Sequence, residues 1–367
     1  MKIVEIDRYD DFLNIKDEWS NFLERCDHTV FSTWEWLSTW WKHFGNNRRL
    51  VLLLAKEGDD ILGTAPLMYS VHSMFGLRRG KIEFIGTPDS DYNDFIIAAG
   101  KEVQCIDLFI DYLNSFSENW DCIDLTDIPE NSGSLSYLKR ISQNFKPVHK
   151  CPYLLLPKSY DLFLKDLSRK TRSHLRKDLR RAEKNFKVEF ADYSVVQSLV
   201  DGMKIFFELH QERWESKGFS GVFADQKICS FNLEIAKSFS QRGWLGLFLL
   251  FFSGNPVAAL YGFKYRSKFY YYLPGFDPRY SRYGVGNLIV SHVIAKCIQE
   301  KLVEFDFLRG AENYKSRWNT KERWNRQSVL IREGLIANIE NWLYDEYWSR
   351  GNRLKDLLKM SYSTVLS

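Results

Sequence analysis

Two stretches of the chain repeat one order of apolar and polar positions. Residues 49–70 read as an apolar strand, a polar turn at Gly58–Asp60 and a second apolar strand. Residues 244–265 repeat this scheme around a turn at Ser253–Pro256. The repetition predicts two copies of one supersecondary unit.

A later pair of strands continues the correspondence. Residues 120–130 and 302–312 each place an acidic residue inside an apolar strand and then enter a polar loop. We therefore predict two related halves, with a boundary near residues 151–157. The N-terminal domain is expected over residues 1–150 and the C-terminal domain, with the functional site, over residues 151–367.

Helices are expected between these strands, because apolar residues recur there with a spacing close to 3.6. Strands that alternate with helices favour a mixed α/β (α+β) fold in which helices flank the sheets. The predicted helices cover residues 32–44, 102–117, 160–186, 195–216, 226–241, 285–300 and 338–360.

Composition supports an ordinary globular protein, with 45% hydrophobic and 27% charged residues among 367. The most apolar stretch, residues 244–252, is far shorter than the ~20 residues of a membrane-spanning helix, so it is predicted to be a buried strand. The first residues mix acids with bases and lack a following apolar segment, which argues against a signal peptide. Six scattered cysteines suggest neither a disulfide framework nor a zinc site, and a cytoplasmic location is expected.

The net charge of +4 is unevenly distributed along the chain. Residues 165–187 contain ten Lys or Arg residues and three acids, above an apolar stripe that includes Leu167, Leu175 and Phe186. Such a segment is either a solvated amphipathic helix or a contact for one anionic ligand.

A glycine-bearing loop at residues 279–287 lies between the strand-like residues 269–276 and an apolar helix. A helix that begins at such a turn offers free N–H groups to a pyrophosphate. Gly284 and Gly286 could equally serve only to shape a tight turn.

Residues 305–318 gather ionisable and aromatic side chains at the end of a strand, where α/β folds often collect functional groups. Asp306 is the candidate catalytic acid of this segment. It could instead form a structural ion pair with Arg309 or Lys315.

His210, Arg213 and Trp214 fall on one predicted helix, and His210 and Trp214 share a face because they are four residues apart. They could line an acceptor pocket. A single helical histidine is, however, often structural. The sequence contains no G-x-S-x-G, H-E-x-x-H, P-loop or full G-x-G-x-x-G motif, which disfavours hydrolase, kinase and nicotinamide chemistry.

Five short motifs in order resemble the CelD/BcsL-like GNAT acyltransferases. They lie at residues 31–45, 90–96, 210–218, 276–278 and 305–318. That family is associated with cellulose and exopolysaccharide biosynthesis and is similar to the Fem-type peptidoglycan transferases.

The resemblance implies a tandem GNAT fold that uses acetyl-CoA or another acyl-CoA, with the donor site in the second half. It implies transfer to an amine or hydroxyl of a small-molecule acceptor, including a saccharide. The donor-phosphate turn would comprise Arg282, Gly284, Val285, Gly286 and Asn287, although Arg282 stands only two residues before Gly284, where GNAT loops have a basic residue or Gln three before.

The same resemblance suggests roles for side chains around the reacting groups. Asp306 or His210 would be the base and Tyr314 the acid that protonates the leaving thiolate. The residues expected to contact the substrate are Arg213, Trp214, Asp277, Arg309, Lys315 and Trp318.

Two other functions remain open from the sequence. A Fem-type transferase that uses aminoacyl-tRNA would explain the basic segment 165–187, although one helix there is less than the long helical hairpin typical of that family. A non-catalytic module that binds an anionic ligand or nucleic acid would also explain the charge, but no specific nucleic acid is expected. The sequence leaves open the acceptor, the acyl chain and the oligomeric state, and predicts no metal.

Overall fold

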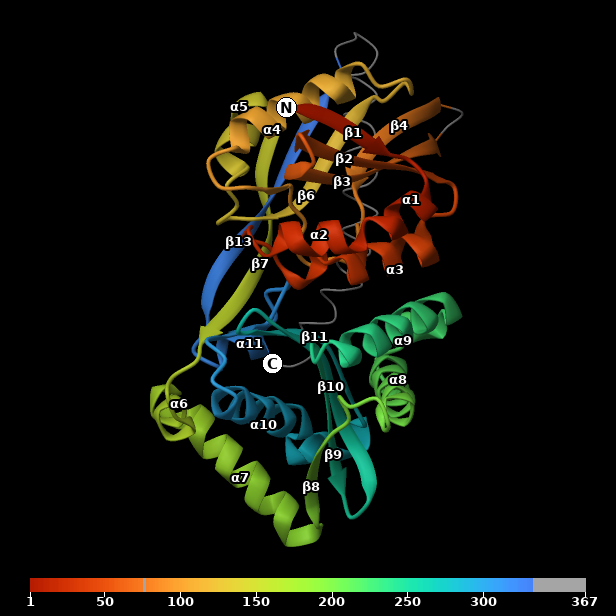
Figure 1. The fold of residues 1–367 in the computed structure, drawn as a ribbon. Helices are drawn as coiled ribbons and strands as arrows, with labels where there is room; N and C mark the ends of the chain where they lie inside the picture. The colour runs from red at the N-terminus through yellow and green to blue at the C-terminus, as the bar shows by residue number, and fades with distance from the viewer. Residues whose placement is uncertain (75–76, 333–367) are drawn as a thin grey trace. The chain divides into compact units, whose positions relative to one another are not determined.

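The computed structural model describes residues 1–74 and 77–332 (Figure 1). The chain divides into two compact units. The first contains residues 1–150 together with the described residues from Arg323 on, and the second contains Cys151–Glu322. The helix expected over residues 338–360 lies outside the described residues.

The second unit is built on a sheet with the strand order β8-β9-β10-β11-β12. Neighbouring strands are antiparallel except β11 and β12, which are parallel. The strands are β8 (Val188–Asp192), β9 (Leu245–Phe252), β10 (Asn255–Tyr265), β11 (Lys268–Phe276) and β12 (Glu304–Asp306). The stretch at residues 244–252, predicted to be a buried strand, is β9.

The first unit repeats this topology. Its sheet has the order β1-β2-β3-β4-β6, with three antiparallel pairs followed by the parallel pair β4–β6. The strands are β1 (Lys2–Ile6), β2 (Arg48–Glu57), β3 (Asp60–Met74), β4 (Leu77–Phe84), the short β5 (Ile96–Ile97), which pairs with β3, and β6 (Cys122–Pro129). The two predicted copies of one mixed α/β unit are therefore confirmed.

Two further strands complete the sheets. β13 (Lys321–Ile331) pairs with β6 from Asn325 on, so most of this C-terminal strand belongs to the first unit although its position in the chain assigns it to the second half. β7 (Asn144–Leu155) ends in the second unit, where Tyr153–Leu155 pair with β12.

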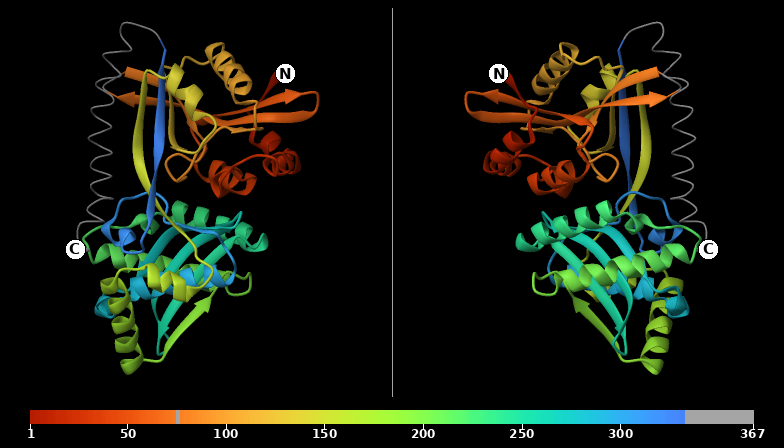
Figure 2. Two further views of the ribbon diagram at one scale, coloured as in Figure 1. Left: turned by 90° about the vertical axis from the view of Figure 1, so that its left-hand side faces the viewer. Right: turned by 90° about the vertical axis from the view of Figure 1, so that its right-hand side faces the viewer.

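Helices cover both faces of the second sheet. α8 and α9 pack on one face against β9–β11, while α10 packs on the other face and contacts α6 and α7 (Figures 1 and 2). Phe248, Phe269 and Phe305 lie in the core beneath α10. The helices of this unit are α6 (Tyr160–Asp166), α7 (Arg169–Asn185), α8 (Leu199–Glu215), α9 (Gln226–Gln241), α10 (Val285–Gln299) and α11 (Asn313–Ser316), with 3-10 turns η2 (Val222–Ala224) and η3 (Pro278–Tyr283).

The first unit has the same layering. α4 packs on the face formed by Val51, Leu53 and Ala55, and α1–α3 lie on the opposite face (Figure 1). The helices are α1 (Tyr9–Asn14), α2 (Lys16–Leu23), α3 (Trp34–Phe44), α4 (Glu102–Asn114) and α5 (Leu135–Ile141), with the 3-10 turn η1 (Val30–Ser32).

The predicted turns form as two-residue hairpins. Ser253 and Gly254 both have positive φ angles, 49° and 85°, which is the backbone of the tight turn that matches strand twist. The single helix predicted over residues 160–186 is wrong, because the chain extends at Leu167 and restarts at Ser168, whose hydroxyl accepts the N–H of Thr171.

Gly275 sets the distance between β11 and α8. A Cβ atom added there would lie 2.7 Å from the backbone nitrogen of His210 and 2.9 Å from the carbonyl carbon of Leu209. Neither contact can relax without moving the helix. The glycine thus brings α8 against the strand that carries the candidate site.

We expect Gly275→Ala to lower the free energy of unfolding by about 1–3 kcal/mol, the usual cost of overpacking. Chemical denaturation monitored by circular dichroism measures this change. Gly286→Ala is the control, because a Cβ there meets only Phe276 at 3.8 Å and the residue is helical, so this variant should not be destabilised. Equal stabilities of the parent and Gly275→Ala would contradict the close approach.

Candidate functional site

The second sheet opens where β11 and β12 separate. The two strands pair only between Lys268–Tyr270 and Glu304–Asp306. Just beyond, the register of β11 against β10 shifts, so that Tyr272 forms a bulge. A bulge bends its strand and increases the local twist. The edge of β11 that follows Tyr270 is therefore not paired with β12.

Aromatic side chains fill the space beside this opening. The rings of Tyr271, Phe305 and Phe307 contact one another, with ring centroids 4.9–6.1 Å apart. The hydroxyl of Tyr314 donates to the hydroxyl of Tyr271 at 3.4 Å. Burial raises the pKa of Tyr271 to about 12 and also raises the pKa of Tyr314 well above its ordinary value. Both phenols are thus protonated at neutral pH.

The loop that carries Tyr314 is held by its own contacts. Lys315, which is buried, forms an ion pair with Glu312 at 2.8 Å and donates to the carbonyl oxygens of Arg309 at 2.8 Å and Gly310 at 3.2 Å. Trp318 is buried and stacks on Phe163. Lys315 and Trp318 therefore position this loop.

Asp306 is completely buried at the end of β12. Its Oδ1 accepts the N–H of Leu308 at 2.8 Å, and Leu308 has a left-handed backbone with φ of 57°. Because Phe305 and Phe307 face the α10 core, strand alternation directs Asp306 to the opposite face. Asp306 thus holds the turn by which the chain leaves the sheet.

The glycine loop forms the predicted strand–turn–helix unit. η3 follows β11, Gly284 adopts a left-handed φ of 65°, and α10 starts at Val285. The N–H groups of Asn287 and Leu288 both bond to the carbonyl of Gly284. This leaves the amides of Val285 and Gly286 at the start of the helix, where the dipole is positive.

The basic helix α7 lies against this turn. Arg181 donates to the carbonyl oxygen of Arg282, and Asp178 lies beside Gly284. Arg282 is exposed, and its guanidinium donates to the hydroxyl of Tyr283 at 2.9 Å. α7 therefore adds positive charge beside the start of α10. The sequence showed the charge of this helix but not that it lies beside the glycine turn.

His210 lies inside α8 and is fixed by Trp214. The indole Nε1 donates to His210 Nε2 at 2.9 Å, so Nδ1 carries the proton of the neutral ring. Nδ1 is buried and has no hydrogen-bond partner among the described residues. Burial, reinforced by Arg213, lowers the pKa of His210 to about 3. His210 is neutral, and its one lone pair is engaged.

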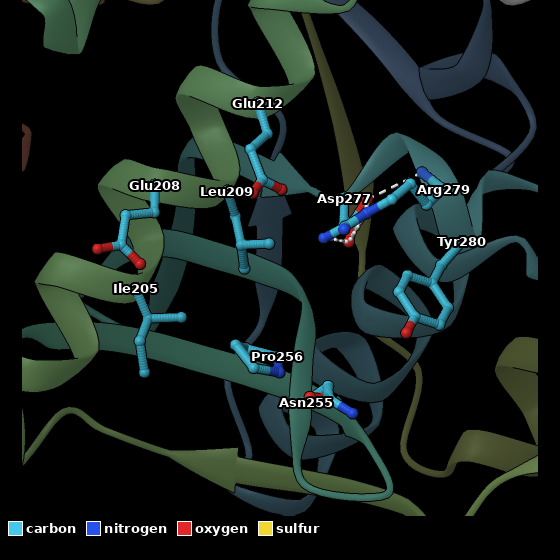
Figure 3. Close-up of a pocket in the computed structure, with 9 residues that line it drawn as sticks. All are labelled: Ile205, Glu208, Leu209, Glu212, Asn255, Pro256, Asp277, Arg279 and Tyr280. Atoms are coloured by element: carbon cyan, nitrogen blue, oxygen red, sulfur yellow. Dashed lines mark hydrogen bonds and ion pairs between the residues drawn. The ribbon is translucent and has the colours of Figure 1, made fainter.

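A cavity of about 320 Å³ lies between α8, the start of β10 and η3 (Figure 3). Asp277 caps η3 by accepting the N–H of Arg279 and pairs with the guanidinium of Arg279 at 2.7 Å. Burial, then the charge of Asp277, raises the pKa of Glu212. The residues around the cavity are Ile205, Glu208, Leu209, Glu212, Asn255, Pro256, Asp277, Arg279 and Tyr280.

The structure brings the candidate residues into three groups within the second unit. The start of α10 holds the glycine turn, the end of β12 holds Asp306 and the Tyr314 loop, and α8 holds His210, Arg213 and Trp214. Sequence reasoning missed Tyr271, which was read only as strand, and Lys217. Lys217 stands four residues after Arg213, a helical spacing that could have revealed it.

Residues 1–74 and 77–332 contain no group of three His, Cys, Asp or Glu side chains arranged to hold a metal ion. Across the same residues, no helix combines the length and hydrophobicity needed to cross a bilayer.

Residues 169–316 match the family described as acetyltransferase (GNAT) domain. This stretch contains α7–α11 and β8–β12, and so includes all three groups of candidate residues. No curated protein matches the chain.

Solved structures resemble the whole chain. FemX superimposes with a TM-score of 0.63 at 14% identity, covering 90% of this chain and 98% of FemX. The C-terminal domain of a putative lysylphosphatidylglycerol synthetase from Agrobacterium fabrum gives 0.53 at 11% identity, covering 90% and 95%. A tandem GNAT protein from the clavulanic acid biosynthesis pathway gives 0.51 at 9% identity, covering 91% and 99%. At these identities the likeness concerns the fold, and it confirms the predicted tandem GNAT arrangement.

His210 should make stability depend on pH. Its pKa lies below the value of 6.5 that it regains on unfolding, so the unfolded state binds a proton first as the pH falls. The contribution of the neutral His210 ring to the free energy of unfolding is complete above pH 6.5. It decreases toward pH 3 by about 1.4 kcal/mol per pH unit.

We expect the parent protein to lose about 2 kcal/mol more than His210→Gln between pH 6.5 and pH 5. Urea denaturation at both pH values measures this difference, and comparing the two proteins cancels the other titrating groups. Parallel losses in both proteins would show that His210 titrates normally.

Proposed function

We propose that the protein transfers an acyl group from acyl-CoA to an amine or hydroxyl of a small-molecule acceptor. One observation carries this proposal: a glycine turn at the start of α10 and a parting of β11 from β12 occur in the same unit. The turn would bind the phosphates of the donor, and the separated strands would bind its thioester. Both lie within the residues that match the GNAT domain.

The donor phosphates would bind the amides of Val285 and Gly286. Gly286 is suited to close approach because the space beside its Cα is nearly empty. Arg282 and the cations of α7 would strengthen the attraction of a pyrophosphate. Asn287 lies in the same first turn of α10.

The thioester arm would follow β11 from the turn to the bulge at Tyr272. The backbone of β11 beyond Tyr270 has no partner in β12, so its N–H groups can donate to the thioester carbonyl. Donors fixed in advance at that oxygen stabilise the negative charge of the tetrahedral intermediate.

In the reaction, the acceptor nitrogen or oxygen attacks the carbonyl carbon of the thioester. The intermediate then breaks its C–S bond, the CoA thiolate takes a proton from the hydroxyl of Tyr314, and the Tyr314 phenolate regains a proton from water. The proton lost by the acceptor passes to water, since His210 offers no free lone pair. Asp306, whose carboxylate accepts the Leu308 amide, acts as a positioning residue for the loop.

The resemblance to enzymes of polysaccharide assembly makes a saccharide a reasonable acceptor. An aminoacyl-tRNA donor is the second candidate, because α7 presents an exposed basic face beside the turn. The chain there forms two helices, α6 with seven residues and α7 with 17. Binding of tRNA would weaken steeply with salt, whereas binding of CoA in a pocket would respond much less.

We expect Gly286→Glu to weaken CoA binding by at least about 100-fold, which corresponds to about 2.7 kcal/mol. The side chain adds bulk and a negative charge beside the phosphates. Isothermal titration with acetyl-CoA measures affinity, and the melting temperature verifies folding. Gly286→Ala should lose far less affinity. An unchanged affinity in folded Gly286→Glu would reject the donor site.

Tyr314→Phe should lower turnover by about 10²- to 10⁴-fold and leave donor affinity nearly unchanged. Asp306→Asn should behave in the opposite way, with a lower melting temperature and nearly intact turnover. Steady-state rates and melting curves of both variants test these roles. If Asp306→Asn is stable but has a low turnover, Asp306 takes part in catalysis. If Tyr314→Phe is fully active, Tyr314 is not the acid.

A further inference from the structure

Arg213 and Lys217 form a pair of cations at the C-terminal end of α8. Arg213 is only 7% exposed, and its Nε makes no hydrogen bond to the described residues. The Nζ of Lys217 is also buried and lacks a hydrogen-bond partner within residues 1–74 and 77–332. Buried cations are normally paired with an anion, because removing them from water is costly.

Both cations contact the ring of Trp214. The guanidinium carbon of Arg213 lies 5.2 Å from the centroid of the Trp214 ring, and Nζ of Lys217 lies 4.9 Å from it. Cation–π contacts and the negative end of the α8 dipole offset part of the cost of burial. Neither supplies oxygen acceptors to the N–H groups.

Among residues 1–74 and 77–332, no acid forms an ion pair with Lys217. Burial, and next the charge of Arg213, lowers the pKa of this lysine, and no carboxylate counteracts the shift. Other buried lysines differ: Lys315 has Glu312 and two carbonyl oxygens, and Lys81 has Glu83 at 2.7 Å and Asp124 at 2.8 Å. Lys315 and Lys81 are thus each paired with an acid, and Lys217 differs from both within the described residues.

Arg213 lies beside the end of β11, in the part of this strand that does not pair with β12. The guanidinium of Arg213 lies 5.0 Å from the centroid of the Phe276 ring, at the end of β11. Burial raises the pKa values of Tyr271 and Tyr314, and the charge of Arg213 offsets a small part of this rise at both hydroxyls. An anion held here would be near the groups that we assign to acyl transfer.

We propose that Arg213 and Lys217 bind an oxyanion, a phosphoryl or carboxylate group, carried by the acceptor. That the anion belongs to the acceptor rests on the proposed function. That Arg213 and Lys217 bind an anion does not depend on it. The guanidinium fork can donate two hydrogen bonds to such a group, and the ammonium adds a point charge. The acceptor would thus be an anionic molecule, such as a phosphorylated or acidic saccharide.

The test uses the full-length chain with inorganic phosphate and, separately, acetate as probes at constant ionic strength. Gly286→Glu serves as the background, so that the start of α10 cannot bind the probe. Lys217→Met and Arg213→Met are introduced into it, and Lys204→Met, which replaces an exposed lysine of α8, is the matched control. Line broadening of ³¹P and ¹H resonances gives the affinities, and melting curves give stability.

We expect Lys217→Met to weaken binding of the preferred probe at least about tenfold without lowering the melting temperature, since it removes an uncompensated buried charge. Lys204→Met should change neither quantity. The stronger probe then identifies the group as phosphoryl or carboxylate. If Arg213→Met fails to fold, Lys217→Met decides alone.

The proposal fails if neither probe binds in the millimolar range. It also fails if Lys217→Met binds as tightly as its background, or if Lys204→Met loses as much affinity. No acyl donor is present in this titration. A negative result therefore leaves the CoA site standing, and failure of CoA to bind would leave this result intact.

Discussion

The separation of β11 from β12 is the constraint on which the rest of the site depends. Three residue pairs hold the strands parallel, and then Tyr272 bulges and β12 ends at Asp306. An opened sheet exposes backbone donors that must find partners. The Tyr271–Tyr314 pair closes one side of the opening, and the start of α10 lies beyond the end of β11.

The two units share one topology but differ where the helix after the fourth strand begins. In the second unit, α10 starts after Gly284 with no acid in its first turn. In the first unit, α4 starts with Glu102, whose carboxylate accepts the amide of Gly100 at 3.1 Å. A carboxylate within the first turn of the helix would repel a phosphate there. In the second unit the carboxylate beside the turn, Asp178, comes from α7 instead, and the guanidinium of Arg181 lies 4.0 Å from it.

The sequence was informative wherever local chemistry determines structure. Hairpin turns follow from residues such as Gly254 that tolerate positive φ, and long helices such as α8 follow from their apolar spacing. The short helices α1 and α2 were missed, because six and eight residues give little periodicity. The bulge at Tyr272 and the packing of α7 against η3 depend on tertiary contacts that no local pattern records.

Positively charged groups lie on both faces of the second sheet. α10 and Asp306 belong to opposite faces of the second sheet, and α8 covers the same face as Asp306. Positive potential thus reaches the strand opening from the α10 side, through the helix start and α7, and from the α8 side, through Arg213 and Lys217. Two anionic groups approaching β11 from opposite faces would keep their charges apart while their reactive atoms meet at the bulge. The direct transfer that we propose requires donor and acceptor to be bound at the same time, and this arrangement of charge would meet that requirement.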